Sequence, residues 1–497
     1  MTRTVPSTPG SRWLALVVLC AGMLMIILDQ TIVNVALPSI RSDLGFSQSS
    51  LSWVVNAYLI PFGGLLLLAG RLGDLIGRRR MFLAGLAVFT AASLLCGLSG
   101  SQQMLIAARF VQGVGGAMAS AVILGMIVTM FPEPPEQAKA IGVYSAVAAA
   151  GASVGLLAGG ILTQAINWHW IFFVNVPIGI AAATAAMRLL ASDRGIGLGE
   201  GADVTGAFLV TGALMLGVYT IVEAVGYGWA SAHTLGFGAV AVAGLAAFLA
   251  RQARAASPLL PLRIFRSRNV SGANLVQILM VAGLFGMFFL CSLYMQRVLG
   301  YDPLRIGLGF LPVAVAIGTL SLGLSARLTT RFGARTVLLP GLALITAGLA
   351  LLSRVPVGGG YVAHLLPVML LLGVGAGLAF TPMMTLAMAG ATGRDSGMIS
   401  GLVNTTQQVG GALGLAVLAS LSTTRSDSQR ASGHSAASAL TSGYHLAFLV
   451  ATGLVLAAII VAATVLRSPA RAQPEIVLAK EPADADADAT HSLAHRS

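Results

Sequence analysis

The sequence predicts an all-α integral membrane protein in which two pseudo-symmetric six-helix bundles flank two inserted transmembrane helices. The prediction depends on an apolar composition, a series of long apolar segments and an internal repeat. Of the 497 residues, 56% are hydrophobic and 9% are charged, and the mean hydropathy is +0.87. Soluble proteins carry roughly 25% charged residues, so this chain cannot cover an ordinary water-facing surface. Soluble enzymes, nucleic-acid-binding proteins and secreted disulfide scaffolds are therefore excluded.

Apolar segments of roughly 20 residues, the length that crosses about 30 Å of hydrocarbon, can be placed fourteen times along the chain. An even number of spans puts both termini on the same side of the membrane. The predicted spans are 13–35, 51–70, 81–99, 104–130, 138–162, 169–190, 204–224, 233–250, 271–296, 305–326, 335–353, 363–388, 396–420 and 444–466.

The basic residues predict which side that is. Of the 29 Lys and Arg residues, 22 fall in the termini and even-numbered loops, and Arg109 lies within span 4. The odd-numbered loops hold only Arg41, Arg297, Arg305, Arg354, Arg425 and Arg430. Because positive residues concentrate on the cytoplasmic side, we expect a protein of the cell membrane with both termini in the cytoplasm. The same partition accounts for the net charge of +12 without a nucleic-acid partner.

Landmarks of the first half of the chain recur in the second half at nearly constant offsets of 256, 260 and 259. A duplication with both copies in the same orientation predicts two halves related by an axis along the membrane normal, as in secondary transporters. The first-half landmarks are Arg71, Gly77, Arg79, Gly113, Gly115, Gly142, Gly151 and Gly155; their copies are Arg327, Gly333, Arg335, Gly373, Gly375, Gly401, Gly410 and Gly414.

The repeat also predicts the domain organisation. Residues 13–190 and 263–466 form the two six-helix bundles, and 191–262 hold the two inserted helices, which have no counterpart in the repeat. We expect these two helices at the edge or the seam of the bundles. Residues 1–12 form a cytoplasmic N-terminus. Residues 467–497 form a polar cytoplasmic tail that is expected to be disordered, because it cannot bury enough apolar surface to offset its ordering entropy.

Three charged residues within or near the spans are candidates for proton or cation coupling. Asp29 lies late in span 1, where a carboxylate is costly unless it is protonated, paired or lining a cavity. Desolvation favours its neutral form, which suits a group that loads and releases a proton. Arg109 must pair or face water, unless it snorkels to the external interface. Glu223, near the external end of span 7, is either a second coupling acid or an interfacial residue.

The loop between spans 2 and 3 is the candidate cytoplasmic gate. Its glycines allow a tight turn and close helix approach. Its carboxylate can bond helix ends or an arginine in one conformation and release them in another. The alternative is a basic cluster that only sets the topology. The gate residues are Gly70, Asp74, Gly77, Arg78 and Arg79.

Small and polar residues within the spans predict a packing seam and a substrate cavity. Glycines spaced by four in span 5 allow close helix packing. No nucleophile–base pair or metal-binding cluster stands out in the spans, so neither an enzyme nor a cofactor is expected. The seam residues are Gly151, Gly155, Gly159 and Gly160, and the cavity candidates are Asn34, Asn56, Tyr58, Gln112, Asn404 and Gln407.

These segments resemble the drug:proton antiporters of the major facilitator superfamily. The resemblance covers about residues 13–466, and its last two segments are similar to spans 6 and 13 of the fourteen-span (DHA2) branch. The segments that carry it are 29–38, 70–80, 109–117, 151–160, 168–179 and 400–411. It implies the major facilitator fold and export of amphipathic or cationic drugs, dyes or antibiotics by alternating access, driven by the proton gradient.

The resemblance also implies individual roles. Asp29 is the proton and cation site, Arg109 the coupling residue, and Asp74 with its arginines the cytoplasmic latch. The second copy of the latch has Thr330 in place of Asp74. Leu156 stands where exporters have proline, which favours the alternative of a carrier for a specific metabolite, exporter or importer. The expected partners are a small-molecule substrate, protons and membrane lipid, and the protein is expected to be monomeric.

Overall fold

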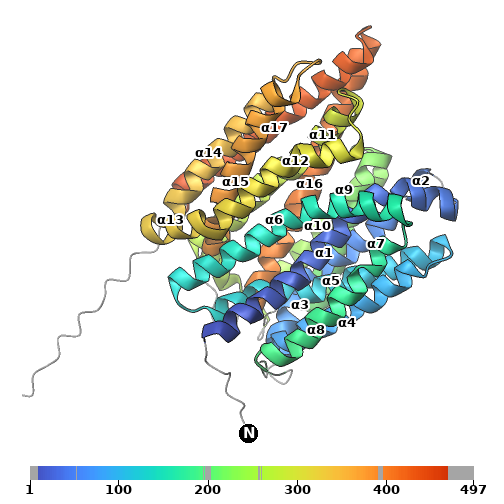
Figure 1. Ribbon diagram of the computed structural model, residues 1–497. Helices are drawn as coiled ribbons and strands as arrows, with labels where there is room; N and C mark the ends of the chain where they lie inside the picture. The colour runs from blue at the N-terminus through green and yellow to red at the C-terminus, as the bar shows by residue number, and fades with distance from the viewer. Residues whose placement is uncertain are drawn as a thin grey trace, which may run out of the picture. The chain divides into compact units, whose positions relative to one another are not determined.

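The computed structural model consists of helices joined by short loops over the part of the chain that it describes (Figure 1). Most of the predicted N-terminus and all but the first residue of the predicted tail lie outside that part, so the tail stays a prediction. The described residues are 9–46, 48–51, 53–193, 195, 197, 203–255, 258, 260–389 and 396–467.

Helices occupy every interval that the sequence predicts as a span. In the first half and the insertion they are α1 (Pro9–Leu44), α2 (Gln48–Leu51), α3 (Trp53–Ile76), α4 (Arg78–Gly97), α5 (Gln102–Met130), α6 (Pro134–Ala165), α7 (Trp170–Phe173), α8 (Asn175–Leu189), α9 (Val204–Tyr227) and α10 (Ala232–Gln252). In the second half they are η2 (Leu262–Arg266), α11 (Arg268–Arg297), α12 (Pro303–Thr319), η3 (Leu320–Leu324), α13 (Ser325–Phe332), α14 (Ala334–Leu352), η4 (Tyr361–Leu365), α15 (Leu366–Ala387), α16 (Ser396–Ala431) and α17 (Ala436–Thr464).

Ten helices among the described residues are long and apolar enough to cross a membrane. The prediction of a helical membrane protein is therefore confirmed, whereas the number of fourteen crossings stays a prediction.

Local sequence explains several helix starts. Ser101, Asp203, Ser231, Ser267, Asp302 and Ser435 each accept a hydrogen bond from a backbone N–H of the turn that follows, which satisfies one of the unpaired donors there.

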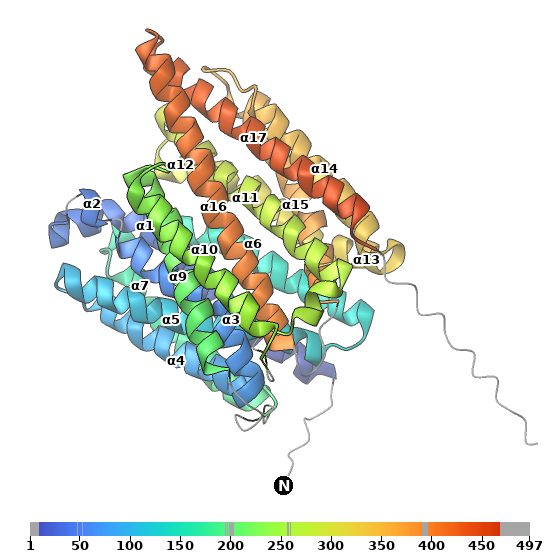
Figure 2. The same ribbon diagram turned by 180° about the vertical axis from the view of Figure 1, so that it is seen from behind.

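The two halves repeat one packing plan. In the first half α4 packs against α5 and α8, and α1 packs against α6. In the second half α14 packs against α15 and α17, and α11 packs against α16. Between the halves, α3 and α5 contact α16, and α6 contacts α12. Figure 2 shows α9 beside α3 and α16, and α10 beside α9, so the insertion lies where the halves meet.

Glycines let the two halves approach closely between α3 and α16. A Cβ atom built on Gly70 would lie 2.5 Å from the carbonyl oxygen of Gly397, and one on Gly401 would lie 2.7 Å from that of Leu66. Each distance is shorter than a carbon–oxygen contact allows. The backbones therefore touch at a separation that any larger residue would increase.

Candidate functional site

Asp29 lies in α1 and is completely buried. Arg109, from α5, is 1% exposed, and its Nη1 donates to Asp29 Oδ2 at 2.6 Å. Removing two charges from water costs several kcal/mol each, and their attraction compensates only when the remaining polar atoms are also bonded. The neighbouring side chains meet that condition.

A set of amide and hydroxyl groups surrounds the ion pair. Gln112 Nε2 donates to Asp29 Oδ1 at 2.8 Å and to Ser93 Oγ at 2.7 Å. Gln112 Oε1 accepts from Arg109 Nη1 at 2.7 Å. Asn175 Nδ2, from the start of α8, donates to Asp29 Oδ1 at 3.0 Å. Three helices of the first half, α1, α5 and α8, thus meet at one carboxylate, and α4 joins the network through Ser93.

The guanidinium of Arg109 is held on its other side by α3. Its Nε donates to the carbonyl oxygen of Val54 at 3.0 Å, and its Cζ lies 4.4 Å from the centroid of the Tyr58 ring. Phe172 provides a second ring at 5.8 Å. A cation over an aromatic face gains roughly 2 kcal/mol when it is desolvated. Arg109 therefore points into the bundle, and the snorkelling alternative is wrong.

One buried ion pair thus ties together helices of the first half. Loss of either charge would leave the other buried without its partner, which costs about 3–5 kcal/mol and would shift the balance between conformations of the surrounding helices. Asp29 and Arg109 therefore meet within the bundle, and their role in ion coupling stays a prediction.

The candidate gate lies at the end of α3. Asp74 is 3% exposed and accepts from Arg78 Nε at 2.9 Å and from Arg78 Nη2 at 2.8 Å. It also accepts from the backbone N–H groups of Gly397 at 3.0 Å and Met398 at 2.8 Å. These are among the first N–H groups of α16, where the helix dipole favours a negative charge. Asp74 therefore ties the first half to the second.

The remaining gate residues act within the first half. Gly77 has φ 104°, a conformation that favours glycine, and it separates α3 from α4. The backbone N–H groups of Arg78 and Arg79 donate to the Asp193 carboxylate at 2.6 and 3.2 Å. Arg79 Nη2 donates to the carbonyl oxygen of Met187 in α8. Arg79 thus fastens α4 to α8, and among the described residues it forms no hydrogen bond or ion pair with Asp74.

Three of the four span-5 glycines face α1. A Cβ atom on Gly151 would lie 3.1 Å from Ile27 Cγ2, and one on Gly159 would lie 2.8 Å from the carbonyl oxygen of Ile32. Gly155 would meet the side chain of Thr31. Gly160 has no atom within 4 Å of such a position, so its assignment to the seam is wrong. It follows Gly159 directly and therefore points about 100° away from the packed face.

Glu223 does not join Asp29 and Arg109. It lies in α9 and accepts from Asn56 Nδ2 of α3 at 3.2 Å. The structure thus places Glu223 apart from the Asp29–Arg109 pair, and its role as a second coupling acid stays a prediction. Because Asn56 lies two residues after Val54, which binds Arg109, the same turn of α3 contacts both acid sites.

The predicted cavity residues are dispersed. Gln112 belongs to the buried network, and Tyr58 lies under Arg109 with its hydroxyl accepting from Gln30 at 3.3 Å. Asn404 donates across the seam to the carbonyl oxygen of Ser120 at 3.4 Å. Gln407 accepts from Gln277 at 3.5 Å. The side chains of Asn34 and Leu156 lie outside the described residues.

Sequence reasoning missed Ser93, Asn175 and Asp193 as members of these sites. Asn175 lies in the 168–179 segment, whose polar residue at the start of an apolar helix was an available signal. Ser93 offers no such signal, because serine in an apolar helix usually bonds its own backbone. Asp193 lies in a loop, where an acid is the ordinary case.

Comparison with known proteins agrees with this architecture. The Major Facilitator Superfamily profile matches residues 19–415. The puromycin resistance protein pur8 of Streptomyces alboniger is 40% identical over 93% of each chain. The cephamycin export protein CmcT of Amycolatopsis lactamdurans is 39% identical over 94% of this chain and 95% of its own. The tetracenomycin C resistance and export protein of Streptomyces glaucescens is 35% identical over 84% of this chain and 77% of its own.

A solved structure extends the similarity to the fold. The crystal structure of the human organic anion transporter MFSD10 (TETRAN) matches with a TM-score of 0.64, covering 92% of this chain and all of that one. At 16% identity this match concerns the fold alone. The helical plan, the profile match and the long alignments agree with one another. The chain belongs to the Major Facilitator Superfamily and is a multi-pass membrane transporter.

Proposed function

We propose that this transporter is a proton-driven exporter of antibiotics or other amphipathic or cationic drugs, with fourteen crossings and cytoplasmic termini. The observation that carries the proposal is the buried Asp29–Arg109 ion pair, because a carboxylate in that position responds to a proton with a change in helix packing. The names of the relatives, which describe puromycin resistance and the export of cephamycin and tetracenomycin C, support export as its direction.

The proposed cycle couples the ion pair to the latch. In the conformation described here Asp74 holds the start of α16, so the halves are joined at the end that carries the latch. Protonation of Asp29 weakens its attraction for Arg109 and favours rearrangement of α1, α4, α5 and α8. A cationic substrate would compete with the proton for the same carboxylate. Such competition produces antiport, because one ligand must leave before the other binds.

The test is transport in proteoliposomes with an imposed proton gradient. The wild type should accumulate puromycin, a basic compound, and an uncoupler should abolish accumulation. Asp29→Asn keeps the size and much of the hydrogen bonding of the side chain but cannot titrate, so coupled transport should be lost. Asp302→Asn is the matched control, because this acid is exposed at the start of α12. Uncoupler-sensitive transport by Asp29→Asn at the wild-type rate would refute the proposal.

A further inference from the structure

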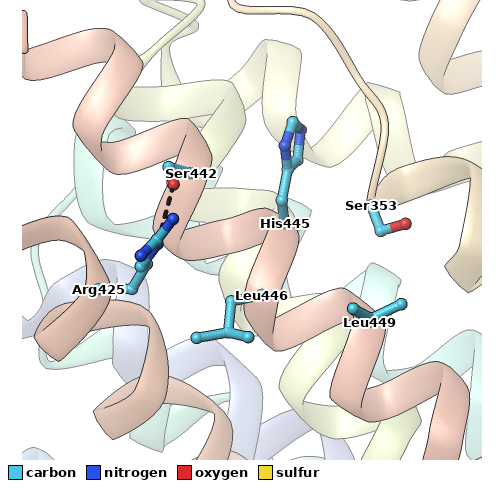
Figure 3. Close-up of a pocket in the computed structure, with 6 residues that line it drawn as sticks. All are labelled: Ser353, Arg425, Ser442, His445, Leu446 and Leu449. Carbon is cyan, nitrogen blue, oxygen red and sulfur yellow. Dashed lines mark hydrogen bonds between the residues drawn. The ribbon is translucent and has the colours of Figure 1, made fainter. Parts of the chain in front are cut away.

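Two small pockets lie near the N-terminal end of α17, far along the chain from the latch. Figure 3 shows the first, a pocket of about 300 Å³ in which Arg425 Nε donates to Ser442 Oγ at 3.3 Å. In the same view His445 comes from α17, and its Nε2 bonds the carbonyl oxygen of Val355 at 2.8 Å. The polar groups of this pocket therefore already have partners within the protein.

The second pocket, of about 210 Å³, lies among α11, α16 and α17 and differs in this respect. Tyr444 lines it and is 3% exposed, yet its hydroxyl has no hydrogen-bond partner among the described residues. A buried hydroxyl without a hydrogen-bond partner destabilises the folded protein. The wall of this pocket therefore has a polar group that a ligand could satisfy.

Two arginines line the same pocket. Arg297 ends α11 and Arg430 lies in the last turn of α16, and both are exposed. Neither guanidinium has a hydrogen bond or an ion pair with another described residue, although Asp427 lines the pocket as well. Two cations and one anion leave one net positive charge at this position.

The charge partition makes these arginines unexpected. The odd-numbered loops, which are predicted to be external, hold only six basic residues. Arg297, Arg425 and Arg430 line the two pockets, and Arg354 follows a residue that lines the first. Topology depletes this side of positive charge. A concentration of four arginines there therefore needs a cause other than topology.

We propose that the second pocket binds a phosphate monoester or diester group, with the headgroup of an anionic phospholipid as its occupant. Arginine presents a planar fork of donors that matches phosphate oxygens. The single net positive charge balances the one charge of a phosphodiester. Phe289 and Leu293, which also line the pocket, provide an apolar wall for the glycerol and the first acyl carbons. Free phosphate shares the charged chemistry but lacks the apolar part.

The experiment measures ligand binding to the purified full-length transporter in detergent. The probes are short-chain phosphatidylglycerol, short-chain phosphatidylcholine and inorganic phosphate, followed by the shift in thermal unfolding and by titration. Phosphatidylglycerol should bind more tightly than the zwitterionic lipid and more tightly than phosphate. Equal binding of phosphatidylglycerol and phosphate would overturn the lipid assignment, and failure of every phosphate-bearing probe to bind would overturn the site.

Substitutions then test the pocket. Arg297→Gln and Arg430→Gln should each weaken phosphatidylglycerol binding by roughly fivefold, as expected for one partly exposed charge pair. Asp427→Asn should tighten it by a similar factor, because it removes a repulsive charge. Arg425→Gln, in the first pocket, is the matched control and should change nothing.

Tyr444→Phe keeps the ring and removes only the hydroxyl, so it should weaken binding by roughly threefold. Unchanged binding in both arginine variants would overturn the proposal. If those variants do not fold, Asp427→Asn decides the question, since binding no tighter than wild type would overturn it equally.

Discussion

The two halves of the transporter share a backbone plan but differ in their interiors. In the first half, α4 and α5 carry polar residues of the hydrogen-bond network around Asp29, whereas the counterparts on α14 and α15 are apolar and completely buried. The close approach of α4 to α5 recurs between α14 and α15, which supports pairing the positions of the two halves through the internal repeat. The polar residues are Ser93, Arg109 and Gln112; their counterparts, at offsets of 256 and 260, are Leu349, Met369 and Leu372. Duplication preserved the scaffold, whereas the buried ion pair lies in one copy only among the described residues.

The gate shows the same asymmetry. Gly77 and Gly333 both have positive φ, 104° and 89°, so the turn recurs in both halves. Asp74 reaches across to α16, whereas Thr330 donates to the carbonyl oxygen of Arg327 in its own helix. A neutral hydroxyl that bonds its own helix cannot hold two halves together. The latch therefore works from one side only.

The largest expected effect comes from replacing a buried polar residue of the first half by its apolar counterpart in the second half. Arg109→Met leaves the Asp29 carboxylate buried without its cation, which should lower the free energy of unfolding by about 3–5 kcal/mol and abolish coupled transport. Thermal unfolding in detergent and proteoliposome transport measure the two effects. Adding Asp29→Leu should restore much of the stability but no transport. A stable single variant that still transports would break the comparison.

The next effect concerns the latch. Asp74→Thr installs the residue of the second half and removes the charged hydrogen bonds to Gly397 and Met398. We expect a loss of about 2 kcal/mol of stability and more frequent opening at this end. Cysteine labelling at Ser400, a buried residue of α16 that cysteine nearly matches in size, measures the opening in a Cys-free background. Thr330→Asp is the control and should not change labelling, because that side chain is exposed.

A smaller effect is expected at the second carboxylate beside the gate. Asp193→Ala removes the side chain that caps the start of α4, which should lower stability by about 1 kcal/mol. Ser101→Ala removes the corresponding cap of α5 and should have a similar effect on stability. Only the Asp193 variant should also slow transport, since it borders the latch. Equal transport rates in the two variants would show that Asp193 serves stability alone.

The smallest effect lies in the inserted helices, which belong to neither half. Asp203 accepts from Gly206 N, from Arg251 Nε at 2.6 Å and from Gln252 Nε2 at 2.8 Å, joining α9 to α10. Burial opposes the charged form, but these hydrogen bonds prevail and lower the pKa of Asp203. Its stabilisation is therefore present above the ordinary aspartate pKa of about 3.9 and is lost as pH falls through the lowered value.

A scan of thermal unfolding from neutral to acid pH measures this contribution. Asp203→Asn should flatten the acid limb of the profile without affecting the coupling network of the first half. A change in the proton coupling of transport by this variant would contradict the separation between the insertion and the halves.

Sequence alone identified the residues whose free-energy cost depends on their own segment and not on the segments that pack against it. A charged residue in an apolar segment is unfavourable wherever the segment packs, so Asp29 and Arg109 could be found without a structure. Asp74 could be found from the glycines and arginines around it in the loop between spans 2 and 3. The helical class, the repeat and the positions of the helices follow from apolar runs and recurring glycines for the same reason. The packing plan that the two halves share agrees with the repeat predicted from the sequence.

Only the tertiary structure decided which groups meet. A serine, asparagine or glutamine in a helix can satisfy itself on its own backbone or on any neighbour. Asn175 and Gln112 became partners of Asp29, and Ser93 a partner of Gln112, only through the packing of four helices. Glu223 was placed apart from Asp29 by the packing of α9 against α3, which local spacing does not determine. Partner choice depends on contacts between distant segments, and these contacts exist only once the chain has folded.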